Sequence, residues 1–142
     1  MASTARTAAL AAVLAVVSTA CRTSPASQTA SICSDLMHLR ATVSFLEAPP
    51  ATASVGEVRG DLQKLDSTIG AVGGSSAVPE SIGKDLEDAR DDYRDVFDGV
   101  GDDDSYSSVA ADAAAPARRL GSAYDAVVVA LTCGGSPSSA VG

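Results

Sequence analysis

The sequence is poor in aromatic and basic side chains, and this shortage excludes several classes of function. It has no Trp, three Tyr and two Phe, so few rings could stack on a sugar or a nucleobase. Ten Lys and Arg residues stand against eighteen Asp and Glu residues, which gives a net charge of −8. The phosphates of nucleic acids and of anionic lipids would repel such a chain. We therefore expect no nucleic-acid partner, and we expect any membrane association to come from a covalent lipid.

The residues that usually carry catalysis are equally scarce. His38 is the only histidine, so a multi-histidine metal site is excluded. A rotation of 100° per residue puts its side chain about 120° from the apolar stripe that begins at Ile32, on an exposed flank. The sequence contains no phosphate-binding loop, no Gly-x-Ser-x-Gly and no Cys–His nucleophile pair. We predict that the chain is not an enzyme and holds no cofactor.

Long apolar runs are also missing, apart from one near the N-terminus that predicts an export signal. Arg6 precedes the apolar run Ala8–Val17, and the small residues Ser18-Thr19-Ala20 follow it. The run is too short to cross a bilayer, which needs roughly 20 residues. We expect residues 1–20 to be a cleaved signal peptide, so that the mature chain begins at Cys21.

The three cysteines divide into one plus two. Cys21 follows the small residues of the processing site, where a lipoprotein carries its lipid. Cys33 and Cys133 lie near the two ends of the remaining chain and predict a disulfide, because an oxidising compartment disfavours free thiols. Ser18 stands where a lipoprotein site usually has Leu or Val, so the alternative is a freely secreted protein with an unmodified Cys21. The pairing of the other two cysteines favours the lipid.

Apolar residues recur in alternating steps of three and four, which predicts four helices and no strand. The boundary signals agree, since two prolines follow the first stripe, a capping box precedes the second and two glycines follow it. We expect an all-α, up-down-up-down four-helix bundle over residues 31–133, between a polar tether (21–30) and a flexible tail (134–142). The stripes and signals are Ile32–Leu46, Pro49-Pro50, Ser54 with Glu57, Val55–Val72, Gly73-Gly74, Ile82–Val100 and Tyr106–Leu131.

The lengths of the first and last helices predict a break in the last one. Helix one covers about 21 Å between Glu47 and Cys33, whereas an unbroken helix from Ser105 to Cys133 would cover about 42 Å. Bonded cysteines need Cα atoms within about 7 Å, so the two depths conflict. We expect a break or strong kink between Asp112 and Pro116, with residues 105–111 as a separate helical segment or an overhang.

Acidic residues are concentrated in residues 85–104, and they end in a glycine-rich turn at 98–104. Oxygens crowded at Asp98, Asp102 and Asp104 suggest a calcium site as one interpretation. The turn lacks the residue order of an EF-hand loop, with no Glu at the twelfth position. The favoured interpretation is a solvated turn that supplies carboxylates to the positive start of the next helix, with no metal bound.

The layout resembles that of small exported proteins and lipoproteins of actinobacteria. These have an export signal, a short Ser/Thr/Pro-rich tether and an Ala-rich helical domain with one cysteine near each end, here represented by Cys21, Cys33 and Cys133. The resemblance implies a cell-envelope location and no particular activity. We expect a lipoprotein on the outer face of the cytoplasmic membrane that acts as a protein-interaction or structural module. The alternative is a bundle that binds a small ligand in a cavity left by its many core alanines.

Overall fold

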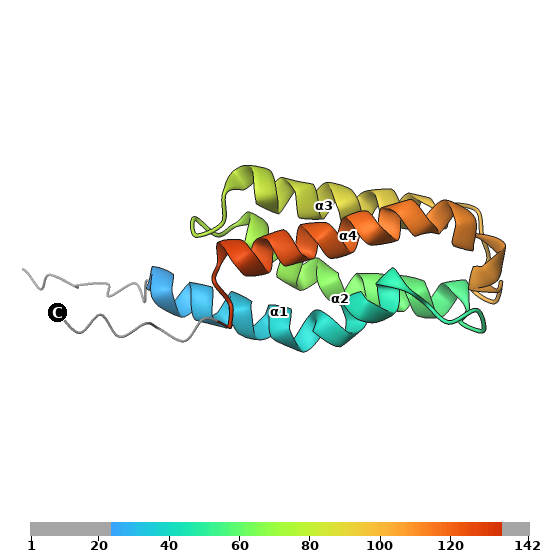
Figure 1. The fold of residues 1–142 in the computed structure, drawn as a ribbon, viewed down its shortest axis with the longest axis horizontal. Helices are drawn as coiled ribbons and strands as arrows, with labels where there is room; N and C mark the ends of the chain where they lie inside the picture. The colour runs from blue at the N-terminus through green and yellow to red at the C-terminus, as the bar shows by residue number, and fades with distance from the viewer. Residues whose placement is uncertain (1–23, 135–142) are drawn as a thin grey trace, which may run out of the picture.

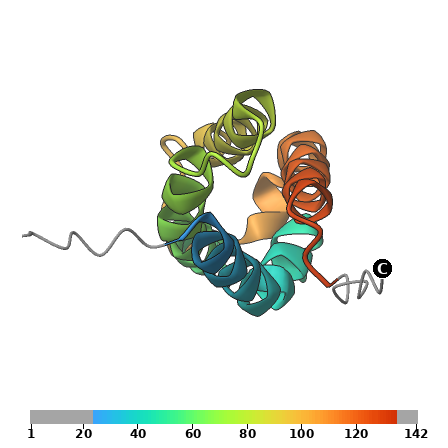
Figure 2. The ribbon, with the colours of Figure 1, turned by 90° about the vertical axis from the view of Figure 1, so that its left-hand side faces the viewer.

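The computed structural model describes residues 24–134, which form a four-helix bundle (Figure 1). Consecutive helices run in opposite directions, and the end view shows them as a ring in which each helix packs on two neighbours (Figure 2). The expected fold is confirmed. The expected signal peptide, Cys21 and nearly all of the expected tail lie outside the described residues. The elements are α1 (Pro25–Glu47), α2 (Val55–Gly73), α3 (Glu80–Asp95), the short 3-10 helix η1 (Tyr106–Ser108) and α4 (Ala110–Ala130).

The boundaries of α2 follow the signals in the sequence. The backbone N–H of Glu57 donates to the hydroxyl of Ser54 over 3.2 Å, and the N–H of Ser54 donates to the carboxylate of Glu57 over 2.8 Å. This reciprocal pair satisfies two donors at the start of the helix. The helix ends at Gly73, the first of the two glycines. Both ends of α2 were therefore predictable from local chemistry.

The first helix begins earlier than expected and takes in most of the predicted tether. It begins at Pro25, so residues 25–30 are helical and not a flexible linker. The hydroxyl of Ser24 accepts the N–H of Ser27 over 3.2 Å, and proline suits the first helical position because its missing N–H has no partner there. The core begins only at Ile32, which is 2% exposed. The first turns of α1 therefore project beyond the bundle (Figure 1).

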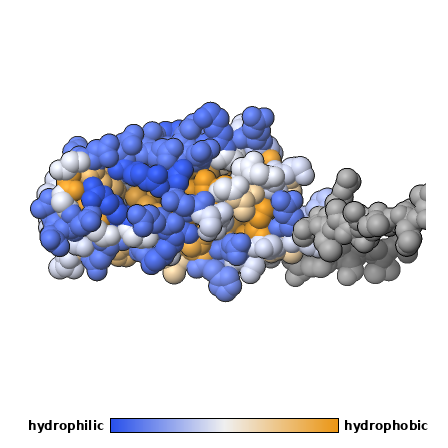
Figure 3. Space-filling view, turned by 180° about the vertical axis from the view of Figure 1, so that it is seen from behind, coloured by the Kyte–Doolittle hydropathy of each residue, from blue (hydrophilic) through white to orange (hydrophobic). Residues whose placement is uncertain are grey.

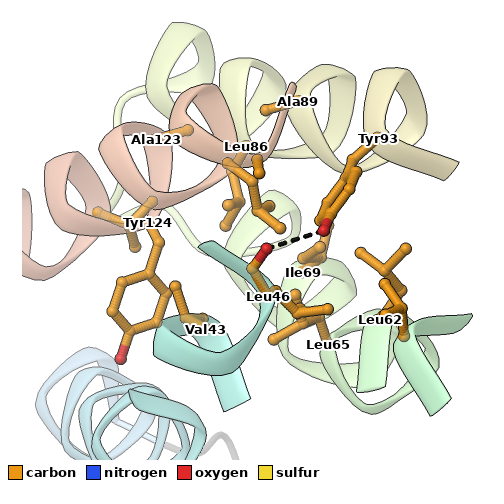
Figure 4. Close-up of a cluster of buried hydrophobic side chains, with 14 of the residues drawn as sticks. Val43, Leu46, Leu62, Leu65, Ile69, Leu86, Ala89, Tyr93, Ala123 and Tyr124 are labelled. Carbon is orange, nitrogen blue, oxygen red and sulfur yellow. Dashed lines mark hydrogen bonds between the residues drawn. The ribbon is translucent and has the colours of Figure 1, made fainter. Parts of the chain in front are cut away.

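The predicted stripes meet in one apolar core. The four long helices each contribute at least one leucine, valine or tyrosine whose side chain is almost fully buried, and the rings of Tyr93 and Phe97 lie 5.4 Å apart between centroids. Small side chains at Ala89, Ala113 and Ala117 are buried as well, which lets α3 and α4 approach closely. Figure 4 shows side chains from several helices pointing into this core.

The third helix stops short of its predicted end. The stripe Ile82–Val100 predicted a helix up to Val100, but α3 ends at Asp95 and residues 96–99 form turns. Gly99 has a φ of +78°, which a residue without a Cβ adopts most easily. Past the helix end, Val96 and Val100 of the predicted stripe are half-buried, whereas Phe97, which is not on the stripe, is fully buried in the core. The periodicity therefore predicted the buried residues correctly only within α3.

The predicted break in the last helix is wrong. One helix, α4, continues from Ala110 through Pro116 to Ala130. The separate segment exists, but it is the turn η1, and the boundary lies at Val109. No helix of residues 24–134 has the length and apolarity that a membrane span requires.

An unbroken α4 is compatible with the disulfide because α1 ends halfway along α4. A Cβ on Gly121 would collide with the carboxyl group of Glu47, so the last residue of α1 lies against the middle of α4. Gly121 to Cys133 covers about 18 Å, close to the 21 Å or so between Glu47 and Cys33. The connection 48–54 covers the remaining depth, since the N–H of Tyr106 donates to the carbonyl of Ala53 over 2.9 Å. The error was to place the end of α1 and the start of α4 at one level.

Candidate functional site

The bundle is closed by a disulfide between Cys33 and Cys133. Their Cα atoms are 5.3 Å apart, although 100 positions separate them in the sequence. The bond joins α1 to the segment just after α4, so it ties the first and last elements of the fold together. The predicted pairing is confirmed. Cys21 lies outside the described residues and is the one cysteine that this bond does not use.

The acidic turn 98–104 docks on the start of α2. The N–H groups of Val55 and Gly56 donate to the carbonyls of Asp104 and Asp102, each over 2.9 Å. These N–H groups lie in the first turn of α2, where a helix has no internal partner for them. A Cβ on Gly56 would lie 3.1 Å from the carbonyl oxygen of Asp102, so glycine permits the close approach. The turn thereby has a defined position in the fold.

Arg59 of α2 holds the same turn through its side chain, and we name this arrangement the Arg59 clip. Its guanidinium donates to the carbonyl oxygens of Phe97 and Val100 and to the carboxylate of Asp102. Three oxygens from one turn therefore surround one cationic group. The side chain of Arg59 is 31% exposed, so water weakens these contacts only in part. Spacing within the turn gave no signal for the clip, because Arg59 lies about forty residues earlier in the chain.

The three suggested calcium ligands are not brought together. Asp102 pairs with Arg59, the carboxylate of Asp104 accepts the N–H of Gly101 over 2.8 Å, and Asp98 is exposed. Within residues 24–134, no three His, Cys, Asp or Glu side chains converge in a way that could hold a metal ion. Oxygens that a calcium ion would need are instead used by a guanidinium or by a backbone N–H.

Ion pairs connect the outer faces of α2 and α3. Asp66 of α2 accepts from Arg90 and from Arg94, the latter over 3.0 Å. Asp91 also lies 3.9 Å from Arg94, on the same helix. A hydrogen bond from Lys84 to Asp88, together with their opposite charges, raises the pKa of Lys84. Exposed pairs such as Arg94 with Asp66 contribute little stability each, whereas the side chain of Arg90 is only 12% exposed. Seen from behind, the bundle shows hydrophilic residues over most of its surface, with apolar residues between them (Figure 3).

The histidine and its neighbour show no functional arrangement. His38 is exposed on α1, as its position relative to the stripe predicted, and Met37 beside it is 50% exposed. The two side chains follow one another on one helix, so they cannot coordinate one metal from opposite sides.

Two buried tyrosine hydroxyls bind backbone carbonyls of α1. Tyr93 donates to Leu46 over 2.8 Å (Figure 4). Tyr124 donates to Leu36. Burial raises the pKa of the Tyr93 hydroxyl, and the hydroxyl of Tyr106, 3.5 Å away, raises it further. Burial also raises the pKa of Tyr124, against an opposing effect of a nearby arginine charge. The carbonyl partners leave both hydroxyls neutral and structural.

Among residues 24–134, the interior of the bundle has no room for a sizeable ligand. The void lined by Leu36, Leu65, Thr68, Leu86 and Tyr124 has a volume of about 10 Å³. Such a volume holds one water molecule at most, whereas ligand pockets usually have about 300–1,000 Å³. A larger hollow of about 570 Å³ is an open surface recess beside the connection between α2 and α3. The alanines of the core therefore bring the helices closer together and do not leave a cavity.

Comparisons with protein-family models, with curated proteins and with solved structures find no match to this chain.

Proposed function

We propose that the protein is an exported lipoprotein of the cell envelope whose helical bundle acts as a protein-interaction or structural module. The observation that carries the proposal is the disulfide between Cys33 and Cys133. Disulfides of this kind persist in oxidising compartments outside the cytoplasm. The bond uses two of the three cysteines, and the remaining Cys21 follows the small residues of the expected processing site. A lipid on Cys21 would hold the bundle on the outer face of the cytoplasmic membrane.

The interior of the bundle supports a role exerted through its surface. The core void of about 10 Å³ is too small for the alternative, a carrier of a small ligand between the helices. The buried tyrosine hydroxyls donate to backbone carbonyls, which supports a structural role for them. The layout shared with exported actinobacterial proteins also supports an envelope location. Free secretion with an unmodified Cys21 is the competing form of this proposal.

The experiment is to express the full chain in an actinobacterial host, separate membranes from soluble fractions, and measure the mass of the N-terminal peptide. We expect wild-type protein in the membrane fraction, with a peptide that begins at Cys21 and carries a lipid mass. Cys21→Ser should remain unprocessed or leave the membrane. The matched control is Cys33→Ser with Cys133→Ser, which removes the disulfide and should leave the lipid in place. Soluble wild-type protein with an unmodified Cys21 would overturn the proposal in favour of free secretion.

A second measurement separates the module from the carrier. Crosslinking in intact cells, followed by identification of the captured proteins, should give specific protein partners for the wild-type chain. Native mass spectrometry of the purified protein should give the mass of the polypeptide and its lipid alone. A small molecule that copurifies in stoichiometric amount would favour the carrier.

A further inference from the structure

The two ends of the bundle differ in charge. At one end lie the start of α1, the connection between α2 and α3, and the end of α4 (Figure 1). Residues 24–34, 74–79 and 131–134 lie at this end and carry no charge, and Glu80, the first residue of α3, follows them directly. At the opposite end lie residues 48–59 and 95–104, which contain six acidic residues and a single basic one, Arg59. We call these the uncharged end and the acidic end.

The proposed lipid would be attached beside the uncharged end. Three residues separate Cys21 from Pro25, where α1 begins. An extended chain covers at most about 3.6 Å per residue, so the start of α1 lies within about 14 Å of the lipidated cysteine. The whole of α1 is about 34 Å long, because it has 23 residues that each rise 1.5 Å. The point of attachment is therefore much closer to the uncharged end than to the acidic end, since the tether is shorter than half of α1.

Electrostatics then favours the approach of the uncharged end to an anionic membrane over that of the α3 side. The potential of such a surface falls off over about 8–10 Å at ordinary ionic strength, so the distant acidic end is screened from it. If the bundle lay along the membrane on its α3 side, exposed carboxylates such as Asp85, Asp92 and Asp95 would enter the repulsive layer. The uncharged end can approach the headgroups without this repulsion.

We infer that the uncharged end is a lipid-facing surface, on which the bundle stands upright with its acidic end directed away from the membrane. The inference rests on the proposed lipid at Cys21 for its place in the cell. It also names the surfaces that remain available to a protein partner, which are the acidic end and the sides of the bundle.

The test is energy transfer in vesicles of phosphatidylcholine and phosphatidylglycerol. The chain from Cys21 to Gly142 is coupled through the Cys21 thiol to a maleimide lipid, which supplies the anchor chemically. A donor dye is attached at position 76, at the uncharged end, or at position 103, at the acidic end. Ser76 and Asp103 are both exposed. The acceptor dye is attached to lipid headgroups. We expect several-fold stronger transfer from position 76 than from position 103. Equal transfer from both positions, or stronger transfer from 103, would overturn the inference.

Two matched substitutions test whether charge causes the orientation. Ala77 and Ala51 are exposed alanines in turns, the first at the uncharged end and the second at the acidic end. With the dye at position 76, Ala77→Asp should reduce transfer on vesicles with phosphatidylglycerol, and added salt or vesicles of phosphatidylcholine alone should restore it. Ala51→Asp should change nothing. Equal effects of both substitutions, or no effect of Ala77→Asp, would contradict an electrostatic origin.

The chemical anchor separates this inference from the proposed function. If cells leave Cys21 unmodified, the envelope lipoprotein is refuted, and the coupled protein still reports whether the uncharged end faces lipid. If cells attach the lipid but transfer from positions 76 and 103 is equal, the lipoprotein stands and the orientation is refuted.

Discussion

The hydroxyl of Tyr93 on α3 donates a hydrogen bond to the backbone carbonyl of Leu46 on α1, over 2.8 Å. In a continuing helix, this carbonyl would accept the N–H of residue 50, but Pro50 has no N–H. Pro49 likewise has no N–H for the carbonyl of Phe45. That carbonyl instead accepts the N–H of Ala48 over 3.2 Å. The two prolines end α1, and a tyrosine from another helix satisfies the carbonyl that they leave open.

Removal of this hydroxyl should cost more than removal of a similar one. Tyr93→Phe leaves a buried carbonyl without a donor, which costs about 1–3 kcal/mol in the free energy of unfolding. Urea denaturation followed by circular dichroism measures this loss. The control is Tyr124→Phe, because the carbonyl of Leu36 lies inside α1 and keeps the helix's own hydrogen bond. An equal loss of unfolding free energy in the two variants would show that the carbonyl of Leu46 does not depend on the Tyr93 hydroxyl more than the carbonyl of Leu36 depends on Tyr124.

The same tyrosine predicts a loss of stability at high pH. Burial raises the pKa of Tyr93 in the folded protein, whereas an unfolded tyrosine titrates near pH 10 or so. The folded state therefore holds the proton more tightly. The contribution of Tyr93 to stability is fully present below about pH 10 and is lost as the pH rises toward the folded pKa. The loss is at most about 1.4 kcal/mol per pH unit for this group.

Urea midpoints between neutral and strongly alkaline pH, with tyrosinate absorbance recorded in parallel, check this slope. Tyr93→Phe should be less stable than wild type at neutral pH and should lose less stability above pH 10, so the two curves converge. Parallel curves would contradict the assignment of the slope to Tyr93.

The disulfide should be the largest single contribution to stability that one chemical change can remove. A loop of 100 positions corresponds to about 4.7 kcal/mol in the chain-entropy treatment, against a total of about 5–15 kcal/mol for a typical domain. Cys33→Ser with Cys133→Ser should therefore lower the thermal midpoint strongly. Cys21→Ser should leave the thermal midpoint of the delipidated domain unchanged. Ready alkylation of two thiols in the folded, unreduced protein would contradict the bridge.

The Arg59 clip should stabilise the fold in the absence of metal. Arg59→Gln withdraws donors from two carbonyls and a charge from Asp102, which should cost about 1–2 kcal/mol after allowance for partial exposure. Lys64→Gln, on the exposed side of the same helix, should cost less than about 0.5 kcal/mol. Calorimetry measures both. Calcium or a chelator should not move the wild-type midpoint, and a clear rise with calcium would restore the calcium interpretation.

Apart from the disulfide, sequence reasoning succeeded where the signal was local and failed where the partner was distant. The ends of α2 depend on Ser54, Glu57 and Gly73, which are neighbours of the groups that they satisfy. The start of α1 was also readable, since Ser24-Pro25 is a cap followed by a first-turn proline, but the small polar residues after it suggested a tether. The end of α3 was not readable, because the carbonyls of residues 97 and 100 bind a side chain from α2. The spacing of residues within the turn could likewise not show that Arg59 donates to oxygens of the suspected calcium site.

Pro116 provides the last prediction, because α4 tolerates a residue that should interrupt it. Proline cannot donate to the carbonyl of Asp112, and its ring crowds that carbonyl, which costs about 3 kcal/mol in a helix interior. The helix continues because Ala113 and Ala117, on either side of the proline, are buried in the core. Pro116→Ala should therefore restore one hydrogen bond. The gain should be about 1–2 kcal/mol, since the unfolded chain also becomes more flexible.

Pro79→Ala is the matched control for this gain. Pro79 lies at the cap of α3, outside the helix ladder, and its φ of −54° suits proline. Its replacement makes the unfolded chain more flexible and relieves no strain in the folded protein. The free energy of unfolding should therefore fall by up to about 1 kcal/mol. Urea midpoints of the two variants should move in opposite directions. If both variants are destabilised, the ring of Pro116 contributes packing to α4 that outweighs the missing hydrogen bond, and the core alanines alone do not explain why the helix continues.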